Sequence, residues 1–549
     1  MYKKLGSILI FAACIATAKA QEYPQDYFRH PLNIPMQLVA NFGEIRANHW
    51  HMGLDIRTQQ KVNLPVYAAA DGYVARVSIE PGGFGQAIYI AHPNGYTTLY
   101  GHLNAFFPAL SQYIKSRQYE QEQWNINLVL PPNLFPVSKG DYIALSGSTG
   151  ASQGPHVHFE IRDTKTEKCL NPLLFNFPIA DAVPPTVYRI AMYDRNKSVY
   201  AQSPQFISTG KGTIRTGSNK LGFAIGAVDR FSGTNNPNGI YSARLLLDGT
   251  PISGFALDNI GYDETRYINA QLDYRYKAGG GADLQMITPL PGARSVAYSF
   301  ANEEGVLYLP DTEVHEAVIE VRDAKGNTTR RTFAIQYDPS ISTIPAPAAT
   351  ERFLPHNVNV FERDGFELYT TELTIYDTVN VSFAVADNYV SGAASPQYAF
   401  LSAAIPSHDS VTVRIKPVNS NPDAHYIIKN TAGSKTFARR GMWQGGWVSA
   451  KFRQFGNYQA FIDNEPPTLN APATNLSRSS SISFTPRDNF GIRSFRAELD
   501  GQWLRLSNNG GRTWIYSFDE HFPPGEHELK VTIEDEAGNV TVRSWQVRR

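Results

Sequence analysis

Alternation of apolar and polar residues is the clearest pattern along this chain, and it predicts β-strands rather than long helices. The best example is residues 156–162, where Val157, Phe159 and Ile161 share one side of the expected strand. One strand face would therefore be buried while the other presents polar, chemically useful groups. That second face carries His156, His158 and Glu160.

A β-hairpin is predicted upstream of this strand. Residues 87–92 and 96–102 are two strand-like runs, and the dipeptide Asn94-Gly95 lies between them. Asn-Gly between two such runs favours a tight hairpin turn, because both residues tolerate positive φ. The second strand of the hairpin would end at His102.

Residues 104–136 break the strand pattern and are predicted to form a helical insertion. The stretch 109–124 contains Gln, Glu, Lys and Arg but no Gly or Pro, which favours a helix. Pro131, Pro132 and Pro136 would end it.

The remainder of the chain contains an internal repeat. Residues 184–340 and 464–549 share four landmarks in the same order: Pro-Pro-Thr, an Asp before an aromatic residue, a strand ending in Asp-Gly, and a strand ending in Asp-x-x-Gly-Asn. We interpret them as two copies of an Ig-like β-sandwich module. Asp-x-x-Gly-Asn also suggests calcium, but a β-turn is favoured because no full cation loop follows.

The predicted fold is therefore mostly β, with an antiparallel β-sheet domain followed by β-sandwich modules. Its predicted parts are a 1–20 signal peptide, an N-terminal domain at 21–180, modules at 184–340 and 464–549, and a β-rich domain at 351–463.

Composition and charge exclude some classes of function. The 549 residues have a formal net charge of +0, so the chain lacks the excess of positive charge that is typical of nucleic-acid-binding proteins. A basic start, an apolar run and Ala18-Lys-Ala20 predict a secretory signal peptide, with no membrane span in the mature chain. Cys169 is then the one cysteine left, so no intramolecular disulfide is expected, and it is interpreted as a packed small residue.

Two clusters have the spacing of metal ligands. The segment His51-Met-Gly-Leu-Asp55 offers an imidazole and a carboxylate, and Gly53 permits a close backbone approach. His156 and His158 share a strand face about a hundred residues later. Imidazole and carboxylate ligands with an open position for water are typical of catalytic zinc. No His-Glu-x-x-His helix is present, so a general base would have to be another group, such as an unligated histidine.

These motifs resemble the lysostaphin/LytM-type zinc metallopeptidases over about residues 40–175. The resemblance implies that His51, Asp55 and His158 hold one Zn²⁺. It also implies that His102 and His156 are catalytic, and it leaves open which of them is the general base. The matching segments are His51–Asp55, Tyr67–Gly72, Leu99–Leu103, Gly147–Gly150 and Gly154–Glu160.

The resemblance implies an exported zinc metalloendopeptidase that hydrolyses peptide bonds in peptidoglycan stem peptides or cross-links. The expected location is the bacterial periplasm or cell envelope, with envelope protein partners held by the C-terminal β-modules. Two alternatives remain. One is a non-catalytic protein that binds peptidoglycan or activates a hydrolase, and the other is a secreted peptidase acting on Gly-rich proteins.

Overall fold

The computed structural model describes residues 23–549 except residues 211, 301, 303 and 509–511. Its regular structure is almost entirely β-strand, paired mainly antiparallel, so the predicted mostly β fold class is confirmed. The predicted signal peptide, residues 1–20, lies outside the described residues. In the described part of the chain, no helix is both long and apolar enough to cross a membrane.

The N-terminal domain (residues 23–180) is built on a large sheet that carries the predicted histidine strand at its centre. Its core is apolar and includes Val157, Phe159 and Ile161, as their alternation predicts. In spatial order the sheet contains β1 (Leu38–Ala40), β4 (Leu54–Arg57), β13 (His156–Asp163), β8 (Tyr96–Gly101), β7 (Gln86–Ala91), β6 (Gly72–Ile79) and β10 (Ile126–Val129). A smaller sheet contains β5 (Pro65–Tyr67), β12 (Tyr142–Ser146) and β9 (Leu103–Phe106).

The predicted hairpin is present as β7 and β8, which pair antiparallel. Gly95 has φ of 86° in the turn, a conformation that glycine adopts without strain. The predicted helix is also present, as α1 (Pro108–Gln121), but the prolines do not end it, because the strand β10 lies between the helix and Pro131. Proline at the first helical position suits its start, because that amide has no partner within the helix.

The module at 184–340 has two sheets around one core. Phe223 of one sheet and Phe333 of the other lie 5.7 Å apart, ring centroid to ring centroid. The first sheet contains β16 (Gln205–Ile207), β15 (Thr186–Asp194), β18 (Lys220–Val228) and β22 (Gln285–Met286). The second contains β17 (Thr213–Thr216), β26 (Thr328–Tyr337), β25 (Val314–Arg322), β19 (Ser242–Leu247), β20 (Thr250–Ala256) and β23 (Tyr298–Phe300).

The two C-terminal parts are also made of paired sheets. Residues 351–463 include β28 (Val360–Arg363), β29 (Phe366–Tyr369), β33 (Pro406–Ile415), β37 (Trp447–Gln454) and β36 (Met442–Gln444) in one sheet. The other sheet of this part has β31 (Phe383–Ala386), β32 (Gln397–Phe400), β38 (Gly456–Ile462), β34 (Tyr426–Ala432) and β35 (Lys435–Arg440). Residues 464–549 contain β39 (Ser481–Phe484) with β42 (Trp514–Ser517), and β41 (Gln502–Trp503), β40 (Ile492–Leu499), β43 (Glu526–Asp535) and β44 (Val540–Arg548).

The sequence repeat is reproduced in backbone geometry. The Asp-Gly turn after β19 has φ of 47° at Asp248 and 78° at Gly249. The equivalent turn after β40 has φ of 48° at Asp500 and 79° at Gly501. Matching positive φ values at both residues indicate the same hairpin turn in both copies.

The N-terminal domain shares a core with the following module. The short strands β14 (Cys169–Leu170) and β21 (Asn259–Ile260) pair and so extend the large sheet into the module. Trp50, Met52 and Cys169 belong to the module's apolar core rather than to that of their own domain. The indole Nε1 of Trp50 donates to Gln271 Oε1 at 2.9 Å.

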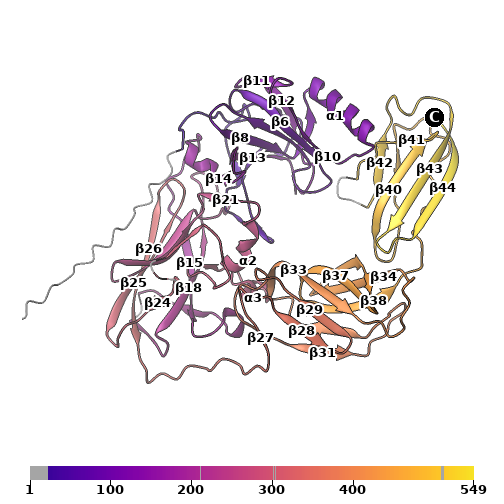
Figure 1. Cartoon of the computed structure of the whole chain (residues 1–549). Coiled ribbons are helices and arrows are strands. Elements are labelled where there is room, and N and C mark those ends of the chain that lie inside the picture. The colour runs from indigo at the N-terminus through magenta and orange to yellow at the C-terminus, as the bar shows by residue number, and fades with distance from the viewer. Residues whose placement is uncertain (1–22, 211, 301, 303, 509–511) are drawn as a thin grey trace, which may run out of the picture.

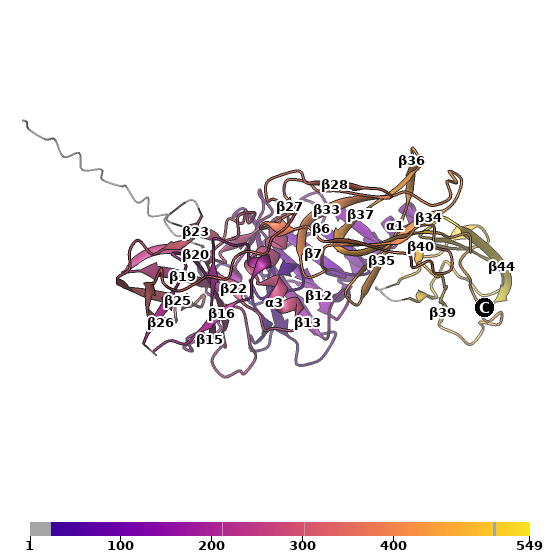
Figure 2. The ribbon, with the colours of Figure 1, turned by 90° about the horizontal axis from the view of Figure 1, so that it is seen from below.

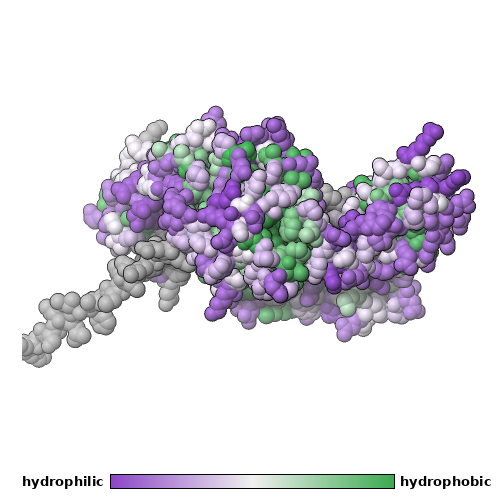
Figure 3. Space-filling view, turned by 90° about the horizontal axis from the view of Figure 1, so that it is seen from above, coloured by the Kyte–Doolittle hydropathy of each residue, from purple (hydrophilic) through white to green (hydrophobic). Residues whose placement is uncertain are grey.

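The four parts contact one another in a closed ring (Figure 1). The ring closes where helix α1 of the insertion meets the C-terminal module: Lys115 Nζ lies 2.8 Å from Asp519 Oδ2, and the rings of Tyr119 and His521 stack at 3.6 Å. Seen from below, the parts form one elongated body (Figure 2). Hydrophilic side chains cover most of the face seen from above, with apolar residues gathered near its middle (Figure 3).

Candidate metal centre

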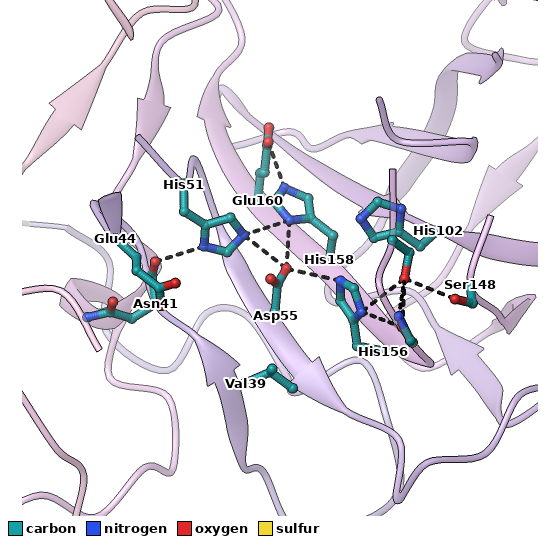
Figure 4. Close-up of polar contacts among 12 residues, drawn as sticks. Val39, Asn41, Glu44, His51, Asp55, His102, Ser148, His156, His158 and Glu160 are labelled. Carbon is teal, nitrogen blue, oxygen red and sulfur yellow. Dashed lines mark hydrogen bonds and ion pairs between the residues drawn. The ribbon is translucent and has the colours of Figure 1, made fainter. Parts of the chain in front are cut away.

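Three of the predicted site residues converge on one point (Figure 4). Asp55 on β4 lies directly opposite His158 on the neighbouring strand β13, and His51 immediately follows the short strand β3 (His49–Trp50). His51 Nε2 lies 2.9 Å from Asp55 Oδ1 and 3.0 Å from His158 Nδ1, and His158 Nδ1 lies 2.9 Å from Asp55 Oδ1. All three residues are buried.

His51 and His158 each use one ring nitrogen to donate a hydrogen bond away from the site. These bonds indicate that the space between the two rings and Asp55 requires a positive charge. His51 Nδ1 donates to the carbonyl of Asn41 at 2.8 Å, and His158 Nε2 donates to Glu160 Oε1 at 2.9 Å. In the neutral rings the opposite nitrogens therefore present lone pairs to each other and to the Asp55 carboxylate. Two imidazoles and one carboxylate facing inward fit zinc, which binds this donor set.

The neighbouring charges shift the pKa values of Asp55 and His158 so that the charged form of each is favoured. Burial alone would raise the pKa of Asp55, but His51, His156 and His158 outweigh it and hold that pKa well below its ordinary value. Burial would lower the pKa of His158, yet Asp55 and Glu160 raise it to about 9. A positive charge, supplied by a proton or by a metal ion, is therefore stabilised here.

Glu160 anchors His158 from behind. It is fully buried on β13 and accepts from Arg162 Nε at 2.7 Å and from the Tyr262 hydroxyl at 2.6 Å, besides His158. Burial would raise the pKa of Glu160, but Arg162 and His158 lower it to about 2, so the carboxylate stays ionised. The Cys169 thiol is buried and donates to Glu160 Oε2 at 3.3 Å, a packed position as predicted.

His102 and His156 lie together beside this point, with ring centroids 4.7 Å apart. His102 Nδ1 donates to the carbonyl of Thr149 at 2.8 Å, and His156 Nδ1 donates to that of Gly154 at 2.8 Å. Their Nε2 atoms are therefore the basic atoms, and that of His156 lies 3.4 Å from Asp55 Oδ1. Burial, followed by His158 and His156, lowers the pKa of His102 to about 3, so this ring is neutral at ordinary pH.

Gly53 and the Gly-rich loop fit the site closely. A Cβ at Gly53 would lie 2.4 Å from the Phe159 carbonyl oxygen, so only glycine allows His51 and Asp55 to approach β13 this closely. A Cβ at Gly150 would lie 2.3 Å from the amide nitrogen of Gly85, where the 147–154 loop meets the turn before β7.

Sequence reasoning did not find two of the contributors. Asn41 acts through its backbone carbonyl, which any residue could supply, so its side chain gives no signal. Tyr262 lies in the next module, about a hundred residues from Glu160, and no local motif marks it. The alternation in residues 156–162 placed Glu160 on the same strand face as His158, but it did not indicate what Glu160 does.

Comparison with known proteins identifies the N-terminal part of the chain. Residues 49–119, which include His51, Asp55 and His102, match the model of peptidase family M23. This part of the chain is similar to an M23 peptidase domain, and residues 23–180 are called the M23 domain below. The resemblance to lysostaphin/LytM-type metallopeptidases that the motifs predicted is thereby confirmed. Residues 350–463 match the model of a Zu5-like domain.

Relatives of the M23 domain include proteins named as bacterial peptidases. The chain is 37% identical over 112 residues to a DD-carboxypeptidase/endopeptidase Mpg of Neisseria meningitidis, covering 20% of each chain. It is 28% identical over 162 residues to the peptidoglycan DD-endopeptidase ShyA of Vibrio cholerae, covering 28% of this chain and 31% of the relative. A zinc-containing peptidase structure from Vibrio cholerae aligns at 29% identity and a TM-score of 0.19, over 25% of this chain and 37% of the other. The chain thus spans about a third or less of these relatives' lengths.

Removing the Tyr262 hydroxyl is expected to weaken zinc binding by the M23 domain. Tyr262→Phe deletes one of the hydrogen bonds that orient Glu160 and, through it, His158. Loss of such an outer contact typically lowers metal affinity about 10-fold or more. Competition with a chromophoric chelator measures that affinity, and Tyr308→Phe, exposed in the same module, is the matched control. Equal zinc affinity in Tyr262→Phe and the parent would contradict a supporting role for Tyr262.

Proposed function

We propose that this protein is an exported zinc metalloendopeptidase that hydrolyses peptide bonds in peptidoglycan stem peptides or cross-links. The observation that carries the proposal is the convergence of His51, Asp55 and His158, with His102 and His156 beside them. The relatives named for peptidoglycan endopeptidase activity support the substrate class.

In this proposal His51, Asp55 and His158 hold one Zn²⁺. When bound, zinc acidifies a water molecule and polarises a carbonyl group. His102 and His156 each direct Nδ1–H to a backbone carbonyl, which fixes the ring and leaves Nε2 basic. Nε2 is therefore the atom that accepts a proton from the attacking water and, once protonated, can donate to the leaving amine or to a developing oxyanion.

The predicted signal peptide supports a location in the periplasm or cell envelope. The C-terminal β-modules are proposed to position the peptidase domain on envelope partners. The direct contact between α1 and the C-terminal module gives the helical insertion a structural role in that arrangement. The insertion and the last module would therefore act together in orienting the site.

The test is digestion of defined substrates by the purified mature chain. We expect about one zinc per chain and release of new amino groups from cross-linked muropeptides, with the cleaved bond identified by mass spectrometry. A Gly-rich protein incubated in parallel should stay intact. Bound zinc with no cleavage of either substrate, but co-sedimentation with peptidoglycan, would support the non-catalytic binding protein instead.

A further inference from the structure

Each of the two repeated modules brings three aspartates together. In the first copy these are Asp181, Asp229 and Asp323, and one ligand atom from each lies within 4.8 Å of the others. In the second copy they are Asp463, Asp488 and Asp535, with the same spacing. The members correspond one to one: an Asp just before Pro-Pro-Thr, the Asp before the aromatic residue, and the Asp of the Asp-x-x-Gly-Asn turn.

The turn predicted from the sequence is present, but it accounts for one aspartate in each group. Asp323 Oδ1 accepts from the amides of Lys325 and Asn327, and Asp535 Oδ1 accepts from those of Gly538 and Asn539. The asparagine side chain of each turn also donates to the backbone carbonyl of Asp181 or Asp463, but neither bond involves the carboxylates of these two aspartates.

Each cluster includes a buried carboxylate oxygen without a hydrogen-bond partner among the described residues. Asp229 is 2% exposed, and its Oδ1 has no hydrogen-bond partner among the described residues. Asp463 in the second copy is also 2% exposed, and its Oδ2 is equally unpartnered within the described part. Two more buried oxygens also lack a hydrogen-bond partner among the described residues: Oδ2 of Asp181 and Oδ1 of Asn238. Asn238 is the cross-strand neighbour of Asp229. A buried acceptor left without a partner costs about 1–3 kcal/mol, and more when charged.

No direct ion pair neutralises the carboxylates of the clusters. Among the residues that the structure describes, no Lys, Arg or His nitrogen lies within 4.0 Å of any of the six carboxylates. Burial, with Asp323 and Asp181 nearby, raises the pKa of Asp229 to about 7. Three crowded carboxylates form a hard, all-oxygen donor set, which suits Ca²⁺. Zinc prefers nitrogen and sulfur ligands, and Mg²⁺ requires a tighter octahedral arrangement.

We propose that each repeated module binds one Ca²⁺ ion, through Asp181, Asp229 and Asp323 in the first copy and Asp463, Asp488 and Asp535 in the second. Asp181 lies between the M23 domain and β15, and Asp463 lies between β38 and the last module. Each ion would therefore tie the segment that enters a module to two loops of that module. Calcium would fix the angle at two junctions of the ring and, through them, the position of the C-terminal module against α1.

The test uses the zinc-loaded mature chain in calcium-free buffer, with CaCl₂ as the probe. We expect Ca²⁺ to raise the melting temperature, with dissociation constants of about 0.1–1 mM, the range of extracellular calcium modules. Equilibrium dialysis with ⁴⁵Ca²⁺ should approach about two ions per chain at saturation. NaCl at equal ionic strength should not reproduce the shift. An equal shift in NaCl or in MgCl₂ would overturn the assignment to calcium.

Single substitutions separate calcium binding from a merely structural role. Asp229→Asn and Asp488→Asn should each remove one of the two sites, and the double variant should lose the Ca²⁺ response. Because each change relieves repulsion among carboxylates, we expect the calcium-free variants to melt at or above the parent's temperature. Asp338→Asn, half-buried in the first module and outside both aspartate clusters, is the matched control and should keep both sites. Lower calcium-free stability with an unchanged Ca²⁺ response would show that the aspartates serve packing alone.

Discussion

His158→Ala is expected to abolish both zinc binding and peptidoglycan hydrolysis, whereas His102→Ala should abolish hydrolysis alone. His158 directs Nδ1, the nitrogen that would bind the metal, toward His51 and Asp55. Loss of the His158 side chain therefore leaves an incomplete set of ligands. His102 is anchored to Thr149 instead, and its Nε2 is one of the two imidazole nitrogens that would carry the proton in the proposed reaction. We expect the His102→Ala rate to fall by at least about 100-fold, the usual contribution of a general base.

Zinc content by mass spectrometry and muropeptide turnover, measured on the same preparations, distinguish these two outcomes. His49→Ala is the matched control, because His49 lies two residues before His51 but is exposed and outside the site. It should retain zinc and activity. Full turnover in His102→Ala would remove His102 from the proposed machinery, and zinc retention in His158→Ala would remove His158 from the ligand set.

A fragment ending at residue 180 is expected to be far less stable than one ending at residue 340. Truncation at 180 uncovers Trp50, which is 0% exposed in the full chain, together with Met52 and Cys169. It also deletes Gln271, the partner of the Trp50 indole, and Tyr262, which supports Glu160. Each large apolar side chain contributes about 2 kcal/mol through burial, a sizeable share of a typical stability of about 5–15 kcal/mol.

Thermal unfolding of the two fragments, each with and without zinc, measures this difference. The longer fragment retains the β14–β21 pairing and should melt cooperatively with a zinc-dependent increase in melting temperature. The shorter one should aggregate or melt at a markedly lower temperature. If the two melt alike, the shared core contributes little and the M23 domain is independent of its neighbour.

The sequence by itself determined the local elements and most of the site. Alternation in 156–162 placed His158 and Glu160 on one face of β13 because side chains on a strand point to alternate sides. Asn94-Gly95 determined the hairpin, and the absence of Gly and Pro determined α1, because both depend on the conformational preferences of neighbouring residues. Motif spacing indicated a metal site at His51, Asp55, His156 and His158, and the resemblance to lysostaphin/LytM-type peptidases added His102 and the division into ligands and catalytic histidines.

Only the tertiary structure decided what joins the parts. The sequence gives no sign that Trp50 is buried in the core of the next module. It also gives no sign that Tyr262 donates a hydrogen bond to Glu160. The aspartates of each triad lie in separate segments, and each of them alone has an ordinary turn interpretation. The residue types that form such contacts are common throughout the chain, so neither periodicity nor short motifs can predict them. They depend on which distant surfaces the folded chain brings into contact.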